Sequence, residues 1–279
     1  MCAFVRLLCW TLFACACAVA LAENVRAEEA PAAIAPDALP TKVAVDPSAL
    51  AEAYFDEAER FDGFLTYEVR RGPARALFTI SRRWRDGLAE LVFDVREPAS
   101  FDKWALLMRQ NRGQSDDLFL YAGSATDGKV RRLAAAQIER QALFELLAVG
   151  DYRPTPRGEL AYELAPDERL DTTPCHVVRA RAPNGNLGFD RLDLVFAADT
   201  GLLLESRFLR GDVEVRRLSA RPEDYREVEG RRLPFRRVAH RWADGGETEI
   251  VLQRVVESSN LPDGLFSTLN LRVQHFPRF

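Results

Sequence analysis

The feature that most constrains the fold is a series of short runs in which apolar and polar residues alternate. Leu65, Tyr67 and Val69 alternate with Thr66 and Glu68, and alternation returns at 76–84 and 91–95. Apolar runs follow at 104–108 and 118–121. A period of two places successive side chains on opposite faces of a β-strand. Turn-forming residues separate several of the runs, as at 71–73, 86–87 and 127–128. These residues therefore predict an antiparallel meander.

A second series of strands is predicted at 160–164, 175–182, 192–196, 202–209, 213–218, 233–242 and 248–256. Two helices interrupt the strands. Asp46 and Pro47 suit the cap and first position of a helix that runs to about Arg60. Apolar residues at helical spacing predict another helix over 134–149, ended by Gly150.

These elements predict the α+β class or an open barrel. The expected architecture is a single curved antiparallel sheet, a half-open barrel, with helices covering its concave face. Where helices cover an apolar face incompletely, a groove remains that can bind apolar ligands. The expected organisation is a signal peptide at 1–22, a flexible lead at 23–45 rich in Ala, Pro and Glu, and one domain at 46–279.

The first residues have the pattern of a secretory signal. Arg6 precedes an uncharged, largely apolar run over 7–22, and small residues stand at Ala20 and Ala22. This predicts cleavage near Ala22 and a periplasmic location. Cleavage after 25–27, a single-pass anchor and a lipid anchor at Cys15 are alternatives, although a bulky Phe13 fits a lipidation motif poorly.

Cys175 is the one cysteine outside the signal segment. An internal disulfide is therefore not expected. We predict a half-buried structural thiol near a strand end. His176 follows it directly and points to the opposite face of a strand, so it is poorly placed to activate the thiol.

The sequence offers no recognisable constellation for catalysis. His176, His240 and His275 lack metal-ligand spacing, and neither a Gly-x-Ser-x-Gly nor a phosphate-binding loop occurs. The acidic pairs 116–117 and 223–224 are interpreted as solvated turns. We therefore expect no enzyme activity, no metal and no cofactor. A net charge of −4 gives no basic excess for nucleic acid.

A basic run lies near the C-terminus and has two interpretations. It could meet an acidic partner or anionic head groups, or it could be a solvated strand face whose arginine stems cover apolar surface. The second interpretation is favoured. The run comprises Arg231, Arg232, Arg236, Arg237, His240 and Arg241.

Several motifs together resemble the outer-membrane lipoprotein-sorting family over about residues 50–275. The sharpest of them is the Gly-x-x-x-Pro step within Tyr225–Pro234. The others are the segments 95–98 with 104–107, 117–121 with 130–133, 173–178, 199–202, 246–248 and 261–267. The middle segment 137–149 departs from the family's acidic-aromatic pattern. The resemblance implies a half-open barrel whose helices plug the concave side and whose members carry lipoprotein acyl chains across the periplasm. Some relatives work beside inner-membrane transporters of the RND type.

The favoured hypothesis is a monomeric periplasmic carrier or chaperone. Its partners would be a lipid or acylated lipoprotein and an RND-type transporter. The alternative is a protein-binding or regulatory module on the same fold, without lipid cargo. Alternation alone selects the candidate residues that line the cavity: Phe78, Ile80, Trp84, Leu91, Phe93, Val95, Trp104, Leu106 and Met108.

Overall fold

The computed structural model describes residues 45–98, 104–112, 114–123, 129–134, 142–143, 147–181, 189–241, 245–273 and 276. They belong to one compact unit, Ala44–Phe279. The predictions for the signal peptide at 1–22, for Cys15 and for nearly all of the lead at 23–45 lie outside the described residues, as do His275 and the helical pattern at 135–141 and 144–146.

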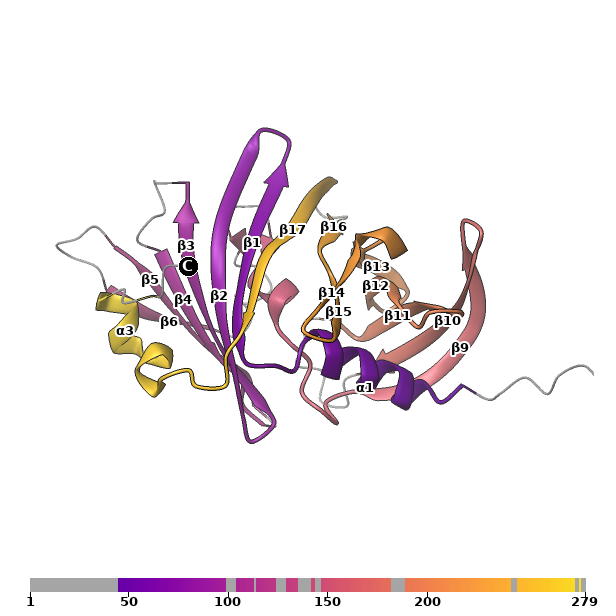
Figure 1. Ribbon diagram of the computed structural model, residues 1–279, viewed down its shortest axis with the longest axis horizontal. Coiled ribbons are helices and arrows are strands. Elements are labelled where there is room, and N and C mark those ends of the chain that lie inside the picture. Colours follow the sequence, from indigo (N-terminus) through magenta and orange to yellow (C-terminus); the bar gives the residue numbers. More distant parts are fainter. Residues whose placement is uncertain are drawn as a thin grey trace, which may run out of the picture. The chain divides into compact units, whose positions relative to one another are not determined.

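The described chain is built mainly of strands (Figure 1). One helix, α1 (Pro47–Ala58), precedes the first meander, which comprises β1 (Gly63–Arg71), β2 (Ala74–Arg85), β3 (Leu88–Glu97), β4 (Trp104–Arg109), β5 (Asp117–Ala122) and β6 (Lys129–Leu133). The middle segment contains β7 (Ala142–Leu143), β8 (Leu147–Ala148) and the 3₁₀ turn η2 (Val149–Tyr152).

The second meander comprises β9 (Ala161–Leu170), β10 (Thr173–Arg181), β11 (Arg191–Ala197), β12 (Leu203–Arg210) and β13 (Val213–Ser219). The elements that follow it are η3 (Pro222–Asp224), β14 (Tyr225–Val228), β15 (Arg231–Pro234), β16 (Arg236–Arg241), β17 (Gly246–Glu257), η4 (Asp263–Phe266) and α3 (Thr268–Val273).

Within the described residues, thirteen strands form one antiparallel sheet in the order β6-β5-β4-β3-β2-β1-β17-β16-β13-β12-β11-β10-β9. Each meander is local in sequence, and β16 and β17 join the two at the centre. Strand β17 pairs with β1 along its length, from Gly63 opposite Glu257 to Arg70 opposite Glu249. The predicted fold class is therefore confirmed, with an open sheet whose edge strands are β6 and β9.

The predicted first helix is confirmed together with its cap. The Asp46 carboxylate accepts hydrogen bonds from the backbone N–H groups of Ser48 (2.9 Å) and Ala49 (3.2 Å), and Pro47 occupies the first turn. These bonds satisfy donors that the start of a helix leaves free.

The predicted helix over 134–149 is wrong where the structure describes it. Ala142 pairs with Ala148 and Leu143 with Leu147, so β7 and β8 form a short hairpin that leads into η2. A short apolar run cannot distinguish helix from strand by periodicity alone.

The predicted strand over 233–242 is also divided. β15 pairs with β14 in a separate two-stranded sheet, whereas β16 joins the main sheet. Pro234 ends β15 and has no backbone N–H to donate to a ladder.

The two faces of the sheet are covered by different elements. The face that carries Phe78, Phe93 and Leu194, called here the inner face, packs under Tyr152 of η2 and under Phe55 of α1. Partly buried apolar side chains, Phe208 among them, complete these two clusters.

The outer face carries Phe64, Val92 and Leu107 and is covered by Phe266 of η4 and Leu271 of α3. Helix α1 thus covers the inner face, as predicted for the helices, while α3 packs against the opposite one. Strands β3 and β4 are buried on both faces over much of their length, and each fully buried Phe or Leu contributes about 1.5–3 kcal/mol.

None of the helices in the described ranges has the length and apolar character needed to cross a membrane.

Candidate ligand-binding site

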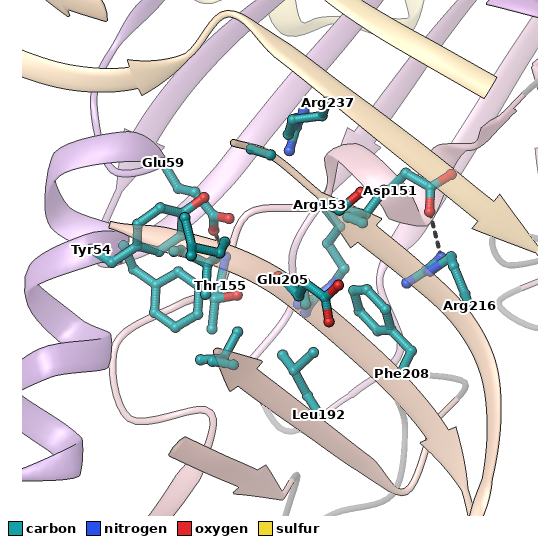
Figure 2. A pocket seen from close by; sticks show the side chains of 18 of the residues that line it. Tyr54, Glu59, Asp151, Arg153, Thr155, Leu192, Glu205, Phe208, Arg216 and Arg237 are labelled. Carbon is teal, nitrogen blue, oxygen red and sulfur yellow. Dashed lines mark hydrogen bonds and ion pairs between the residues drawn. The ribbon is translucent and has the colours of Figure 1, made fainter. Parts of the chain in front are cut away.

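A hollow that is partly open to solvent lies on the inner face under α1, and the free space within it amounts to about 80 Å³. Helix α1, the segment 149–155 and strands β11 to β13 surround it (Figure 2). Six apolar side chains form much of its wall: Phe55, Leu160, Leu192, Leu194, Phe208 and Leu218. We call it the first hollow. Its largely apolar lining is typical of sites that bind small ligands.

A second hollow, with about 50 Å³ of free space, adjoins the first and extends toward β1 and β2. Leu65, Leu233 and Leu252 contribute apolar walls to it. The two hollows share a polar boundary, called here the junction, that consists of Tyr54, Glu59, Asp151, Arg153 and Arg237. The site therefore combines a largely apolar first hollow with a second hollow of mixed polarity, and charged side chains lie at their boundary.

The nine residues predicted to line a cavity all belong to or pack against the inner-face cluster. Seven are fully buried, and Trp84 and Trp104 pack against the cluster as partly buried side chains. Ile80 and Leu91 also line the second hollow. Phe78 and Phe93 instead contact the ring of Tyr152, at centroid distances of 5.3 and 6.1 Å. Whether the nine contact a ligand stays a prediction.

Ion pairs fix two of the junction residues. Arg153 binds the Asp116 carboxylate through Nε (2.5 Å) and the Glu159 carboxylate through Nη2 (2.7 Å). These hydrogen bonds keep the pKa of Arg153 above its usual value, although desolvation alone would lower it. The interpretation of Asp116 as a solvated turn residue is wrong, because its side chain is 6% exposed and holds the wall of the site.

Asp151 is the second fixed residue of the junction. Its buried carboxylate accepts Arg216 Nη1 at 2.6 Å, drawn in Figure 2, and Arg241 Nη2 at 3.0 Å. The two arginines lie on β13 and β16, so the contact ties η2 to the centre of the sheet.

Glu59 follows α1 and lies at the junction beside Thr155 (Figure 2). Its Oε2 accepts the Thr155 backbone N–H at 2.8 Å. Desolvation raises the pKa of Glu59 above its ordinary value, and the Thr155 hydrogen bond and nearby arginines offset only part of that effect.

The basic run does not form one solvated face, which corrects the favoured interpretation. Arg231 pairs with Glu257 and lies over the Phe61 ring, while Arg241 reaches Asp151. Arg236, 47% exposed, pairs with Glu249, whereas Arg237 lines both hollows. Successive side chains of β16 alternate between the faces.

Sequence reasoning missed the polar residues of the site: Tyr54, Glu59, Asp151, Tyr152, Arg153 and Arg237. These residues lie in or just after α1, in the segment 149–155 and in β16, which are far apart in the sequence. The basic run was the one signal that pointed to the site.

Cys175 is fully buried, not half-buried, and its Sγ donates to the Thr173 carbonyl at 3.3 Å. Burial raises its thiol pKa, which disfavours a reactive thiolate. His176 pairs with Asp167 at 3.0 Å. In the part of the chain that is described, three or more His, Cys, Asp or Glu side chains nowhere gather closely enough to hold a metal ion.

Comparison with known proteins adds a family and a fold. A family model described as "Uncharacterized protein" matches residues 88–273. A comparison with curated proteins finds no match.

Three solved structures are similar over 81% of this chain. An outer membrane lipoprotein-sorting protein domain from Vibrio parahaemolyticus is 15% identical, with a TM-score of 0.70 and 97% of that chain covered. A DUF1329 family protein from Desulfovibrio piger is 20% identical, with a TM-score of 0.69 and 97% covered. A LolA superfamily protein from Nitrosomonas europaea is 16% identical, with a TM-score of 0.62 and 99% covered. The chain therefore has the fold that its sequence resemblance implies.

Proposed function

Because the chain belongs to the family whose model matches residues 88–273 and has the fold of lipoprotein-sorting proteins, we propose that it is a periplasmic carrier of acyl chains. The cargo is a lipid or an acylated lipoprotein, held in the hollows of the inner face. The observation that carries this proposal is the first hollow, whose largely apolar wall lies beneath α1.

The physical basis of binding is the burial of methylene groups. Each buried CH₂ contributes about 0.8 kcal/mol, so a long acyl chain binds strongly and leaves slowly. Efficient delivery then requires a partner that accepts or expels the chain. An inner-membrane transporter of the RND type fits that role by family resemblance, and the carrier acts as a monomer without a cofactor.

The first experiment is native mass spectrometry of the mature protein, purified from the periplasm without detergent. A bound mass that organic extraction removes is expected, and its fragmentation identifies the cargo class. An empty protein that also fails to bind a fluorescent fatty acid would contradict the carrier function.

A steric variant tests whether the hollow is the site. Ser206 lines the first hollow, so Ser206→Phe should fill part of it and lower the amount of bound lipid several-fold. Val213 is 66% exposed on the neighbouring strand, and Val213→Phe serves as the matched control that retains normal loading. Equal lipid loading of the two variants would place the cargo elsewhere.

A protein-binding module without lipid cargo is the second candidate. It is favoured by the edge strand β9, which pairs with β10 alone among the described strands and so has one open side. A partner strand can add to such an edge. However, β9 contains Pro166 and several charged residues, features that discourage strand addition.

A further inference from the structure

Three side-chain donors of the second hollow have no acceptor among the residues that the structure describes. Arg82 donates through Nε to the Phe61 carbonyl at 3.1 Å, but its buried Nη2 has no partner. The Tyr152 hydroxyl is also buried without a partner. Arg82 and Tyr152 are only 6% and 7% exposed. Arg237 makes no hydrogen bond or ion pair within the described chain.

Buried donors without acceptors are unfavourable, and native proteins rarely retain them without a reason. One such donor would carry little information. Two of them, Arg82 Nη2 and the Tyr152 hydroxyl, line the same hollow as the half-buried Arg237. A bound carboxylate or phosphate can accept hydrogen bonds from all three side chains, which is what a site for an anion requires.

The charges at the junction leave a net excess of one positive charge. Asp151 pairs with two arginines and Arg153 pairs with two carboxylates, so the net charges of these two clusters cancel in sum. The charged groups without an ion pair in the described chain are then Arg82 and Arg237 against the Glu59 carboxylate. A ligand with one negative charge balances this set.

Arg237 keeps its charge in this setting. Desolvation lowers the pKa of Arg237. The opposite effect of its neighbours Tyr67, Tyr54, Tyr152 and Glu59 is larger, so the pKa lies above the usual value. Figure 2 shows Arg237 on one side of the first hollow and the apolar side chains of Leu192 and Phe208 on the other. A head group at Arg237 therefore leaves the apolar wall free for an acyl chain.

We propose that the site binds an acyl chain with a singly charged anionic head group, which Arg237, Arg82 and Tyr152 hold while the chain occupies the first hollow. The inference rests on the proposed carrier function and specifies its ligand. The head group is a fatty-acid carboxylate or a lipid phosphodiester, which share the single negative charge.

The test measures equilibrium binding of palmitate, 1-palmitoyl-lysophosphatidylglycerol and hexadecanol by displacement of a fluorescent lipid probe. Arg237→Met retains much of the apolar stem and removes the charge. Arg236→Met is the matched control, since Arg236 is the neighbouring residue of β16, exposed and paired with Glu249. The wild type and Arg236→Met should bind at least one anionic ligand about tenfold more tightly than hexadecanol.

Arg237→Met should lose that preference while its affinity for hexadecanol stays unchanged. The stronger of the two anionic ligands identifies the head group. If the wild type binds all three ligands equally, the anion site is wrong and the carrier function stands. If it binds none of them, the carrier function itself fails.

A second variant covers the case in which Arg237→Met does not fold, as judged by its thermal unfolding. Tyr152→Phe keeps the ring that packs on Phe78 and removes only the unpaired hydroxyl. We expect a few-fold weaker binding of the anionic ligand and unchanged binding of hexadecanol. Unchanged affinity for both ligands would show that Tyr152 does not belong to the site. If Arg237→Met also fails to fold, that result overturns the inference.

Discussion

At the scale of single residues, Glu59 shows how burial at the site opposes a negative charge. It lies at the junction of the two hollows and accepts one hydrogen bond, from the Thr155 backbone. Desolvation raises its pKa above the ordinary value of 4.5, more than the nearby arginines lower it. The folded state therefore holds the proton of Glu59 more tightly than the unfolded state does.

This shift predicts a pH-dependent gain in stability for Glu59→Gln. A raised carboxyl pKa contributes stability below the unfolded pKa, and that contribution is lost as pH rises through the folded pKa. Glutamine mimics the protonated acid and can still accept from Thr155. Glu59→Gln should thus melt at a higher temperature than the wild type at pH 7, and the gain should vanish below about pH 4, near the unfolded carboxyl pKa.

Thermal unfolding followed by circular dichroism across this pH range measures the effect. Glu223→Gln is the control, because that carboxylate is 67% exposed and should show no pH-dependent difference. A constant difference between Glu59→Gln and the wild type at every pH would mean that ionisation of Glu59 is not its source.

At the scale of elements, the central pair β1 and β17 joins segments that are almost two hundred residues apart. Gly63 begins β1 opposite Glu257. A Cβ atom at Gly63 would lie 2.4 Å from the backbone oxygen of Val256, which is too close for any side chain. The pairing therefore needs glycine at this position because of the close approach of the two strands.

Gly63→Ala should destabilise the protein by about 1–3 kcal/mol, since one strand must shift to relieve the overlap. Gly264→Ala is the matched control, because a Cβ atom at Gly264 would meet no other atom within 4 Å among the described residues. Urea denaturation of both variants measures the free energy of unfolding. Equal stability of Gly63→Ala and Gly264→Ala would show that the start of β1 adjusts without cost.

At the scale of the whole described unit, Asp151 connects η2 to the centre of the sheet. Its carboxylate is completely buried and accepts from Arg216 of β13 and Arg241 of β16. Tyr152, the next residue, covers Phe78 and Phe93 in the inner-face cluster. The two ion pairs of Asp151 thus hold η2, whose Tyr152 packs on the inner-face cluster and lines the second hollow.

Asp151→Asn removes the charge that Asp151 presents to Arg216 and Arg241. Breaking a buried ion pair in this way costs about 3–5 kcal/mol. Asp212→Asn is the control, since Asp212 is fully exposed and meets Arg191 at 3.4 Å, and it should change stability by less than about 0.5 kcal/mol. Chemical denaturation measures the free energy of unfolding of both variants. A decrease of less than about 1 kcal/mol for Asp151→Asn would show that water replaces the carboxylate.

The sequence by itself determined the strands and the class of fold. Alternation at Leu65, Tyr67 and Val69 and in the later runs fixes which side chains share a face, because the period of a strand is a local property of the backbone. Asp46 and Pro47 determined the start of α1 for the same reason, since capping depends on residues two and three positions away. Hydrophobic periodicity failed where it was ambiguous, as at 142–143 and 147–148, which form a short hairpin and not a helix.

Only the tertiary structure decided the site. Glu59, Tyr152 and Arg237 come from α1's end, η2 and β16, and no local pattern indicates that these three meet. It also decided that α3 covers the outer face and that Arg237 and Arg236 have different surroundings. Such contacts depend on the order of strands in the sheet and on which segments cover each face, and those arise from packing between residues far apart in the chain.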